Sequence, residues 1–216
     1  MTKNLGFNTI HVHELFTFKI LEQVHSELLN LFNFCKENDF KEKCVFEKNA
    51  FKTMNLMHLV EGKKLANFIC SEINQSNAGS LPEKFFRCMD THDLQSFHIV
   101  EYAEDGYEEP NYNMHKDSFF IIFSLKKNGK KQLKVYKEKK LNNILIYGFA
   151  KLDQVFAYPA GWAREVVLTD KTTTDMVAFF HFIYNPKKII IKENKDQKKK
   201  FSFKNFIKNY FLRFKK

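Results

Sequence analysis

The sequence predicts an α+β protein whose core is a jelly roll, a double-stranded β-helix made of two antiparallel sheets. Two observations predict it: helical periodicity in the first half of the chain, and a change from about Leu94 to short apolar segments separated by polar turns. Helices followed by a run of short strands are typical of a helical layer packed on a two-sheet β domain. We therefore expect one domain over residues 1–186, with supporting helices in 1–93 and strands in 94–186.

Two segments carry the helical pattern. Residues 13–38 place apolar side chains at spacings of three to four, which predicts an amphipathic helix; they are Phe16, Ile20, Val24, Leu28 and Leu31. Residues 54–76 repeat the pattern, and Gly79 and Pro82 in the next stretch indicate a loop.

The strand-like segments are rich in β-branched and aromatic residues. They are residues 94–110, 118–138, 142–150, 154–170 and 173–186, and we expect seven or eight strands from them. The dipeptide Asn128-Gly129 inside the second segment predicts a type I′ hairpin, because both residues tolerate positive φ values.

The net charge of +10 is concentrated at the C-terminal end. Residues 187–216 hold twelve Lys and Arg against two acidic residues, whereas residues 1–186 hold 23 of each sign. A neutral body disfavours a nucleic-acid-binding domain. The four cysteines are scattered, and the start lacks a basic stretch followed by an apolar one, so we expect a cytoplasmic protein with reduced thiols.

The C-terminal segment itself reads as a polar linker followed by a basic amphipathic helix. One aromatic and aliphatic stripe runs along it, formed by Phe203, Phe206, Ile207, Tyr210, Phe211 and Phe214. Such a helix suits the surface of an anionic membrane, to which the domain would then be peripheral. The alternative, which the same pattern also suits, is docking on the body of the protein or on a partner subunit.

A histidine and an aspartate stand two positions apart in "NYNMHKDSFFIIF". Residues i and i+2 of a strand share a face, so His115 and Asp117 would project together. A neutral imidazole beside a carboxylate is two-thirds of a 2-His-1-carboxylate iron site. The same pair is also compatible with an ordinary strand edge. "HVH" at 11–13 has metal-ligand spacing as well, but exposed histidines explain it more simply.

The order of segments over residues 94–186 resembles the Fe(II)/2-oxoglutarate-dependent dioxygenases of the prolyl-hydroxylase-like branch. The residues that carry the resemblance are "FHIVEYAEDGYEEPNYNMHKDS", "VFAYPAGWAREVV" and "TTTDMVAFFHFIYNP". The resemblance implies an oxidative enzyme that uses Fe(II) and 2-oxoglutarate, with His115 and Asp117 as metal ligands. It also implies a contact between Tyr102 and the cosubstrate.

Two positions depart from the family pattern. Arg164 stands where the resemblance expects the distal histidine, and Thr174 and Asp175 stand where it expects an arginine for 2-oxoglutarate. A guanidinium has no lone pair for a metal. The third ligand would then be His181, or Glu165 if the strand is bulged, and Arg164 would hold an anionic cosubstrate or product.

The sequence thus supports two hypotheses about function. The first is an iron-dependent oxygenase that hydroxylates a small molecule or a protein side chain. The second is a catalytically inactive protein of the same fold, which has lost the distal histidine and the arginine and serves as a binding or scaffold module. A cupin-like metal protein with another reaction is a third, weaker alternative.

Overall fold

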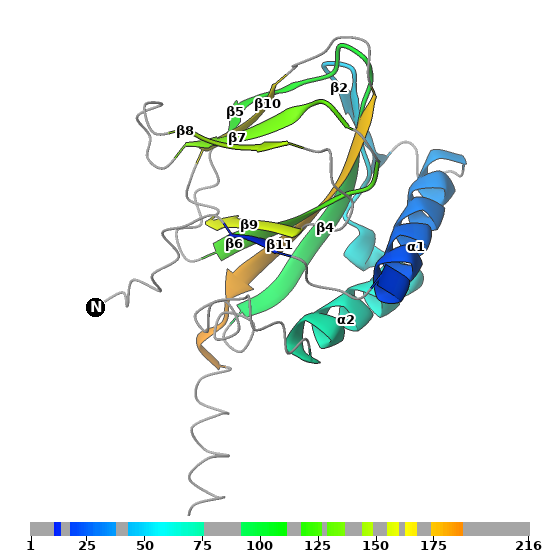
Figure 1. Cartoon of the computed structure of the whole chain (residues 1–216). Coiled ribbons are helices and arrows are strands. Elements are labelled where there is room, and N and C mark those ends of the chain that lie inside the picture. Colours follow the sequence, from blue (N-terminus) through cyan, green and yellow to red (C-terminus); the bar gives the residue numbers. More distant parts are fainter. Residues whose placement is uncertain are drawn as a thin grey trace, which may run out of the picture.

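The structure is a computed structural model that describes residues 11–13, 18–37, 43–75, 92–111, 118–126, 129–136, 144–148, 155–159, 163–167 and 174–187. Two sheets face each other, and two helices lie against the outer side of the larger one (Figure 1). In this part of the chain no helix has the length and apolar character needed to cross a membrane.

Within the described residues, the larger sheet has seven strands in the order β1-β9-β6-β11-β4-β3-β2, and the smaller has four in the order β5-β10-β7-β8. Every pairing is antiparallel. The larger sheet contains β1 (His11–His13), β2 (Val45–Glu47), β3 (Ala50–Lys52), β4 (His92–Tyr102), β6 (Ser118–Ser124), β9 (Val155–Pro159) and β11 (Asp175–Tyr184). The smaller contains β5 (Glu108–Asn111), β7 (Gln132–Tyr136), β8 (Ile144–Gly148) and β10 (Ala163–Val167).

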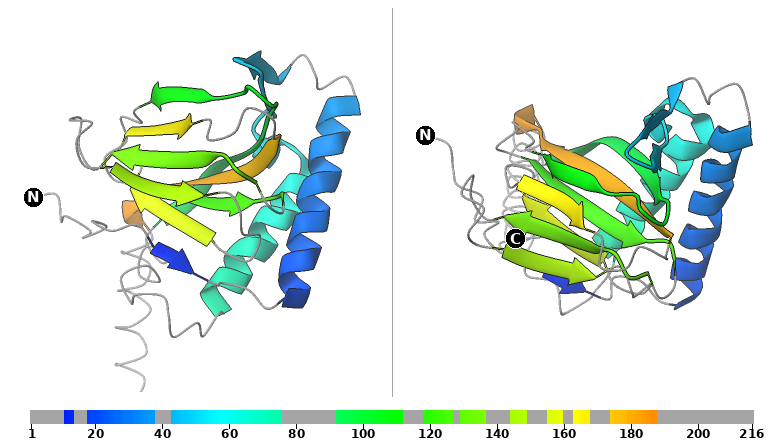
Figure 2. Two further views of the ribbon diagram at one scale, coloured as in Figure 1. Left: turned by 45° about the horizontal axis from the view of Figure 1, so that its top comes forward. Right: turned by 90° about the horizontal axis from the view of Figure 1, so that it is seen from above.

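From β4 onward the chain passes back and forth between the two sheets, as the two views of Figure 2 show. The strands β4, β6, β9 and β11 belong to the larger sheet, and β5, β7, β8 and β10 to the smaller. This winding is that of a jelly roll. The predicted jelly-roll fold is therefore confirmed, and the described residues between His92 and Tyr184 form eight strands, where seven or eight were expected. The predicted C-terminal helix lies outside the described residues.

The helices α1 (Phe18–Glu37) and α2 (Val60–Gln75) cover the outer face of the larger sheet (Figure 1). The first buries one stripe of side chains at helical spacing, namely Val24, Leu28, Leu31 and Cys35. They pack on outward-facing strand residues such as Phe97 and Phe180, whose rings stack at 4.8 Å. Burial, with the neighbouring Cys44 thiol, raises the pKa of the Cys35 thiol to about 11.

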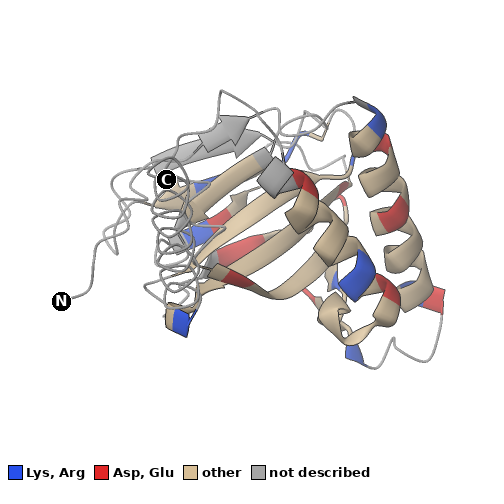
Figure 3. Ribbon diagram, turned by 90° about the horizontal axis from the view of Figure 1, so that it is seen from below, with Lys and Arg blue, Asp and Glu red and all other residues tan. Residues whose placement is uncertain are grey.

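The second core lies between the sheets and is formed by alternate residues of facing strands. It contains Val100, Tyr102, Ile122, Leu133, Val135, Phe156, Tyr158, Val166, Val177 and Phe179. Over the described helices and strands, basic and acidic residues are interspersed (Figure 3). A few polar side chains point into the otherwise apolar space between the sheets, and these side chains form the candidate site.

Two expectations about the N-terminal half need correction. The stretch expected to be helical also contains β1, β2 and β3, which extend both edges of the larger sheet. The second helix begins at Val60 rather than near residue 54, because the Asn55 side chain accepts a hydrogen bond from Met57 N and caps a short 3₁₀ turn at Leu56–His58.

Asn128 lies outside the described residues, but the hairpin expected at Asn128-Gly129 would pair β6 with β7, and these strands lie in different sheets, so this expectation is wrong. The strand before it, β6, pairs with β9 and β11, whereas the strand after it, β7, pairs with β8 and β10. The segment therefore crosses from one sheet to the other. A tight hairpin does occur between β2 and β3, where Lys48 and Asn49 have φ values of 50° and 55°.

Candidate functional site

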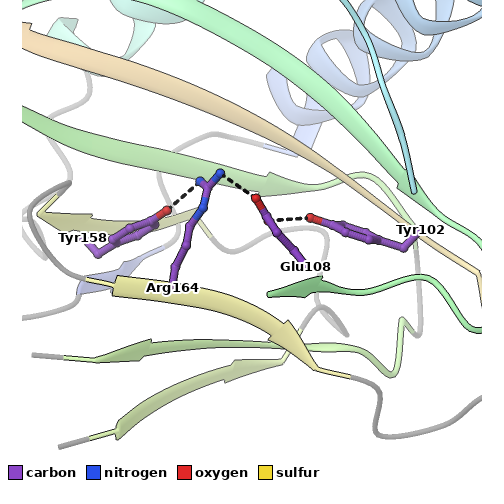
Figure 4. Close-up of polar contacts among 4 residues, drawn as sticks. All are labelled: Tyr102, Glu108, Tyr158 and Arg164. Carbon is purple, nitrogen blue, oxygen red and sulfur yellow. Dashed lines mark hydrogen bonds and ion pairs between the residues drawn. The ribbon is translucent and has the colours of Figure 1, made fainter. Parts of the chain in front are cut away.

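Arg164, on β10, points into the space between the two sheets and is 12% exposed. Its Nη1 donates a hydrogen bond to the Tyr158 hydroxyl at 2.8 Å, and its Nη2 lies 3.1 Å from Glu108 Oε1 (Figure 4). The guanidinium is thus tied to β9 of the larger sheet and to β5 of the smaller one.

Aromatic rings from the larger sheet cover the same guanidinium. The Cζ atom of Arg164 lies 4.8 Å from the ring centroid of Phe120 and 4.4 Å from that of Phe179. Contacts of this kind between a guanidinium and an aromatic face are attractive, more so when water is excluded. Hydrogen bonds and ring contacts together hold Arg164 in one orientation.

Glu108 is the acidic member of the network. Its second carboxylate oxygen, Oε2, accepts a hydrogen bond from the Tyr102 hydroxyl at 3.2 Å (Figure 4). The ladder between β5 and β10 pairs Arg164 with Asn111 but Val166 with Glu108, so β5 contains one extra residue. This bulge, next to Pro110 on an edge strand, turns Glu108 toward the interior.

The pKa values of the network favour a charged Arg164 and neutral tyrosines. Burial raises the pKa of Tyr158 to about 12 and that of Tyr102 well above its usual value. Burial opposes the charge of Arg164, but the Glu108 carboxylate and the Tyr158 hydroxyl outweigh it, so the pKa of Arg164 is raised.

His98 and Lys52 lie on neighbouring strands of the same interior face. Lys52 pairs with Val100, a residue of the interior core, and His98 precedes Val100 by two positions on β4. The His98 Nδ1 atom lies 3.1 Å from the carbonyl oxygen of Thr53. Burial, followed by the positive charge of Lys52, lowers the pKa of His98 to about 4, so its imidazole is neutral at pH 7.

A second polar group surrounds Asp175 at the start of β11. Its Oδ2 accepts a hydrogen bond from the Lys131 backbone N at 2.9 Å, while its Oδ1 is buried without a hydrogen-bond partner among the described residues. The buried Lys131 ammonium donates to the Glu104 carbonyl oxygen at 2.9 Å. Burial raises the pKa of Asp175.

His181, the residue expected to be a third metal ligand, is 8% exposed and stacks on Phe120. The two ring centroids are 4.4 Å apart and the rings are inclined by 16°. His181 thus contacts one of the two rings that cover Arg164.

Some of the predicted site residues lie within the described part of the chain and others lie outside it. Tyr102 and Arg164 both contact Glu108, and their predicted contact with an anionic cosubstrate stays a prediction. His115 and Asp117 lie outside the described residues, so their metal-binding role stays a prediction. The histidines of "HVH" lie on β1, which pairs with β9.

Sequence reasoning missed Glu108, Tyr158, Lys52 and His98. Strand parity is a usable signal for two of them, because Tyr158 follows Phe156 and His98 precedes Val100 at a spacing of two. Glu108 faces inward only because β5 is bulged, and Lys52 lies in a stretch expected to be helical.

The described residues do not fit an iron(II) ion. No group of three His, Cys, Asp or Glu side chains within the described ranges is placed to hold a metal. On β10, the position that the resemblance assigns to a histidine ligand carries the charged Arg164, which lacks a lone pair and repels a cation. The described residues do not fit 2-oxoglutarate either. At the start of β11, where the resemblance expects an arginine to bind its carboxylate, the chain has the acidic Asp175.

Solved structures supply the comparison for this fold. No protein-family model and no curated protein matches the sequence. An oxidoreductase of the 2OG-Fe(II) oxygenase family from Burkholderia pseudomallei superposes with a TM-score of 0.60 at 9% identity, over 81% of this chain and 84% of that one.

Two further structures agree with this match. EctD from S. alaskensis, with 2-oxoglutarate and 5-hydroxyectoine, superposes with a TM-score of 0.58 at 11% identity, over 81% of this chain and 72% of that one. A prolyl hydroxylase from Trichoplax adhaerens, in complex with a hypoxia inducible factor peptide, gives 0.53 at 12% identity, over 87% and 88%. This chain therefore has the fold of the 2OG-Fe(II) oxygenases.

Proposed function

We propose that this chain is a binding or scaffold protein built on the oxygenase fold and that it does not use iron chemistry. The observation that carries the proposal is the Arg164–Glu108 pair, which lies between the sheets at the β10 position where the resemblance expects a histidine ligand. The guanidinium stays protonated, cannot donate electrons to a metal, and opposes the approach of a divalent cation.

The same contacts prevent Arg164 from moving aside to admit a metal. Leaving would break its bonds to Tyr158 and Glu108 and expose the faces of Phe120 and Phe179. Glu108 would then remain without its cationic partner in a site largely shielded from water, which is costly. A fixed interior network of this kind is suited to holding a ligand or supporting the β domain, with no chemical step.

The test is anaerobic titration of the full chain with Fe(II) by calorimetry, together with NMR detection of succinate formed from 2-oxoglutarate. We expect no saturable binding at micromolar iron and no succinate. Iron binding that is lost in His115→Ala, with succinate formed by the unmodified chain, would overturn the proposal.

One variant pair sharpens this test. Arg164→His removes the cation and supplies an imidazole at the same position, whereas Arg164→Gln removes the cation and supplies no such ligand. We expect iron binding to appear in Arg164→His alone. Circular dichroism should first establish that both variants keep the β-rich fold.

The second candidate is the oxygenase itself, acting on a small molecule or a protein side chain. The fold shared with the named oxygenases and the His-x-Asp sequence at 115–117 favour it. It needs His115 and Asp117 as ligands of Fe(II), His181 as the third ligand, and Tyr102 and Arg164 near 2-oxoglutarate. The iron titration above separates it from the first candidate.

The basic C-terminal segment supports a further part of the proposal. Its aromatic stripe and lysines favour a contact either with an anionic membrane surface or with a partner subunit, and they lie outside the described residues. In either case the segment would tether the β domain.

A further inference from the structure

Lys52 is a cation on the interior face of the larger sheet. On β3, Phe51 packs into the core beneath the helices, while Ala50 packs against the interior core. Lys52 shares the face of Ala50, since the two are separated by two positions. Within the described ranges its ammonium has no hydrogen-bond or ion-pair partner, although the side chain is partly buried.

The position of Lys52 brings it into the electrostatic field of the Arg164 network. Burial lowers the pKa of Lys52, the positive charge of Arg164 lowers it further, and Glu108 acts in the opposite direction. The positive charges of Lys52 and Arg164 both lower the pKa of His98. Lys52 on β3, and Arg164 and Glu108 on β10 and β5, therefore face the same interior from the two sheets and form one charged cluster.

The charge of this cluster is not balanced. Lys52 and Arg164 are cations, and among the described residues Glu108 is the one carboxylate that interacts with both, while Tyr102, Tyr158 and His98 stay neutral at pH 7. One positive charge is left over among the described members. A partly buried excess charge is unfavourable unless a counter-charge joins it.

We propose that Lys52 and Arg164 bind the carboxylate group of a small organic acid in the space between the sheets. The inference rests on the proposed function, because it treats this space as a ligand site without iron. One carboxylate carries one negative charge and so balances the cluster. Its two oxygens can accept from the Lys52 ammonium and from N–H groups of Arg164 that neither Tyr158 nor Glu108 uses.

The carboxylate is favoured over a phosphate dianion for a simple reason. A dianion would replace one unbalanced positive charge by one unbalanced negative charge in the same partly buried cluster. Glu108 also has a role in this site. Its carboxylate reduces the excess positive charge of Lys52 and Arg164 to a single charge, and its contact with Arg164, together with the Tyr158 hydrogen bond, fixes the orientation of the guanidinium.

The test uses thermal unfolding of the full chain with acetate, propionate or lactate, which carry one negative charge each, without metal and against sodium chloride at matched ionic strength. We expect at least one of these acids to raise the melting temperature saturably, by about 2–6 °C, whereas inorganic phosphate does not. Lys52→Met should abolish the shift. Lys134→Met is the matched control, because Lys134 lies on the outer face of the smaller sheet, 3.9 Å from Glu165.

The melting temperature without any acid provides a second readout. Lys52→Met should raise it, since the substitution removes a partly buried cation that is repelled by Arg164. A carboxylate shift of equal size in Lys52→Met and Lys134→Met, or no shift in the unmodified chain, would overturn the inference.

The two proposals fail in different ways. If neither iron nor any of these acids binds, the carboxylate site is wrong and the absence of iron chemistry stands. If iron binds and succinate forms, the proposed function is wrong, whatever the acids do in the absence of metal.

Discussion

Arg164 and Glu108 meet where little water can reach them, and each depends on the other. The side chains are 12% and 27% exposed, so neither charge is well solvated alone. Removing one member of such a pair costs more than the pair contributes, because the remaining charge stays in the interior.

Glu108→Gln should lower the free energy of unfolding by about 2–3 kcal/mol, since it leaves Arg164 without a counter-charge. Urea denaturation followed by circular dichroism measures the loss. Glu109→Gln is the control on the same strand, because Glu109 is 62% exposed and pairs with Lys48. Equal losses in the two variants would contradict the interior role of Glu108.

His98 should make the protein sensitive to acid. Its pKa in the folded chain is about 4, below the usual 6.5, so between these values the unfolded chain binds more protons. The contribution of His98 to the free energy of unfolding is complete above pH 6.5 and is lost as the pH falls toward 4. Its upper limit is about 3 kcal/mol.

His98→Gln should reduce the dependence of stability on pH in this window, as measured by urea denaturation from pH 4 to 7. His58→Gln, at an exposed position, should retain the behaviour of the unmodified chain. In Lys52→Met the His98 pKa should rise, because one of the charges that lower it is gone. NMR titration of the imidazole protons tests this directly.

At the scale of elements, the β2–β3 hairpin and the loop between β4 and β5 support each other. The Ala103 backbone N donates to the Asn49 carbonyl oxygen at 2.9 Å, and the Asn49 side chain donates to Asp105 at 2.8 Å. Gly106 lies against the same turn. This loop leads into β5 and therefore sets the position of Glu108.

Gly106→Ala should destabilise the protein by about 1–3 kcal/mol, because an added Cβ would lie 2.4 Å from the Asn49 carbonyl oxygen. The effect should extend to the site, seen as a weakened carboxylate shift in thermal unfolding. Asp105→Ala, which removes one exposed hydrogen bond, should cost less. A Gly106→Ala variant as stable as the unmodified chain would mean that the turn and loop separate readily.

The order of helices and strands could be predicted because periodicity is a local signal. The apolar spacing of Val24, Leu28 and Leu31 requires only one helix face, and the strand segments carry their own turn residues. The passage of the chain from the larger sheet at β6 to the smaller sheet at β7 could not be predicted, since strand pairing is decided by distant segments.

The candidate site could be predicted only in part, for a related reason. Tyr102 and Arg164 were identified through the resemblance, yet their shared partner Glu108 depends on a bulge that periodicity does not show. Lys52 was missed because its strand has three residues, too few for an alternating pattern to stand out.

Considered as a whole, the molecule combines a body of balanced charge with a strongly basic C-terminal segment. Residues 1–186 hold equal numbers of basic and acidic residues, so electrostatic attraction to an anionic surface would come from residues 187–216. Two forces would then act together, burial of aromatic side chains and charge attraction.

The full chain should co-sediment with phosphatidylserine-containing vesicles at low salt, and Phe206→Ser combined with Phe211→Ser should weaken binding by about tenfold or more. Vesicles of phosphatidylcholine alone are the control for charge. Absence of binding at low salt would leave docking on a partner subunit as the role of the segment.

The accessibility of the Cys35 thiol reports whether the helices are packed on the larger sheet. Cys35 is fully buried where α1 meets the larger sheet, and burial keeps its thiol protonated, with a pKa of about 11. A thiol reagent can therefore reach it only when α1 opens away from the sheet, and the labelling rate measures the free energy of that opening. If labelling is much faster than global unfolding permits, the helices detach as a separate cooperative unit while the jelly roll stays closed.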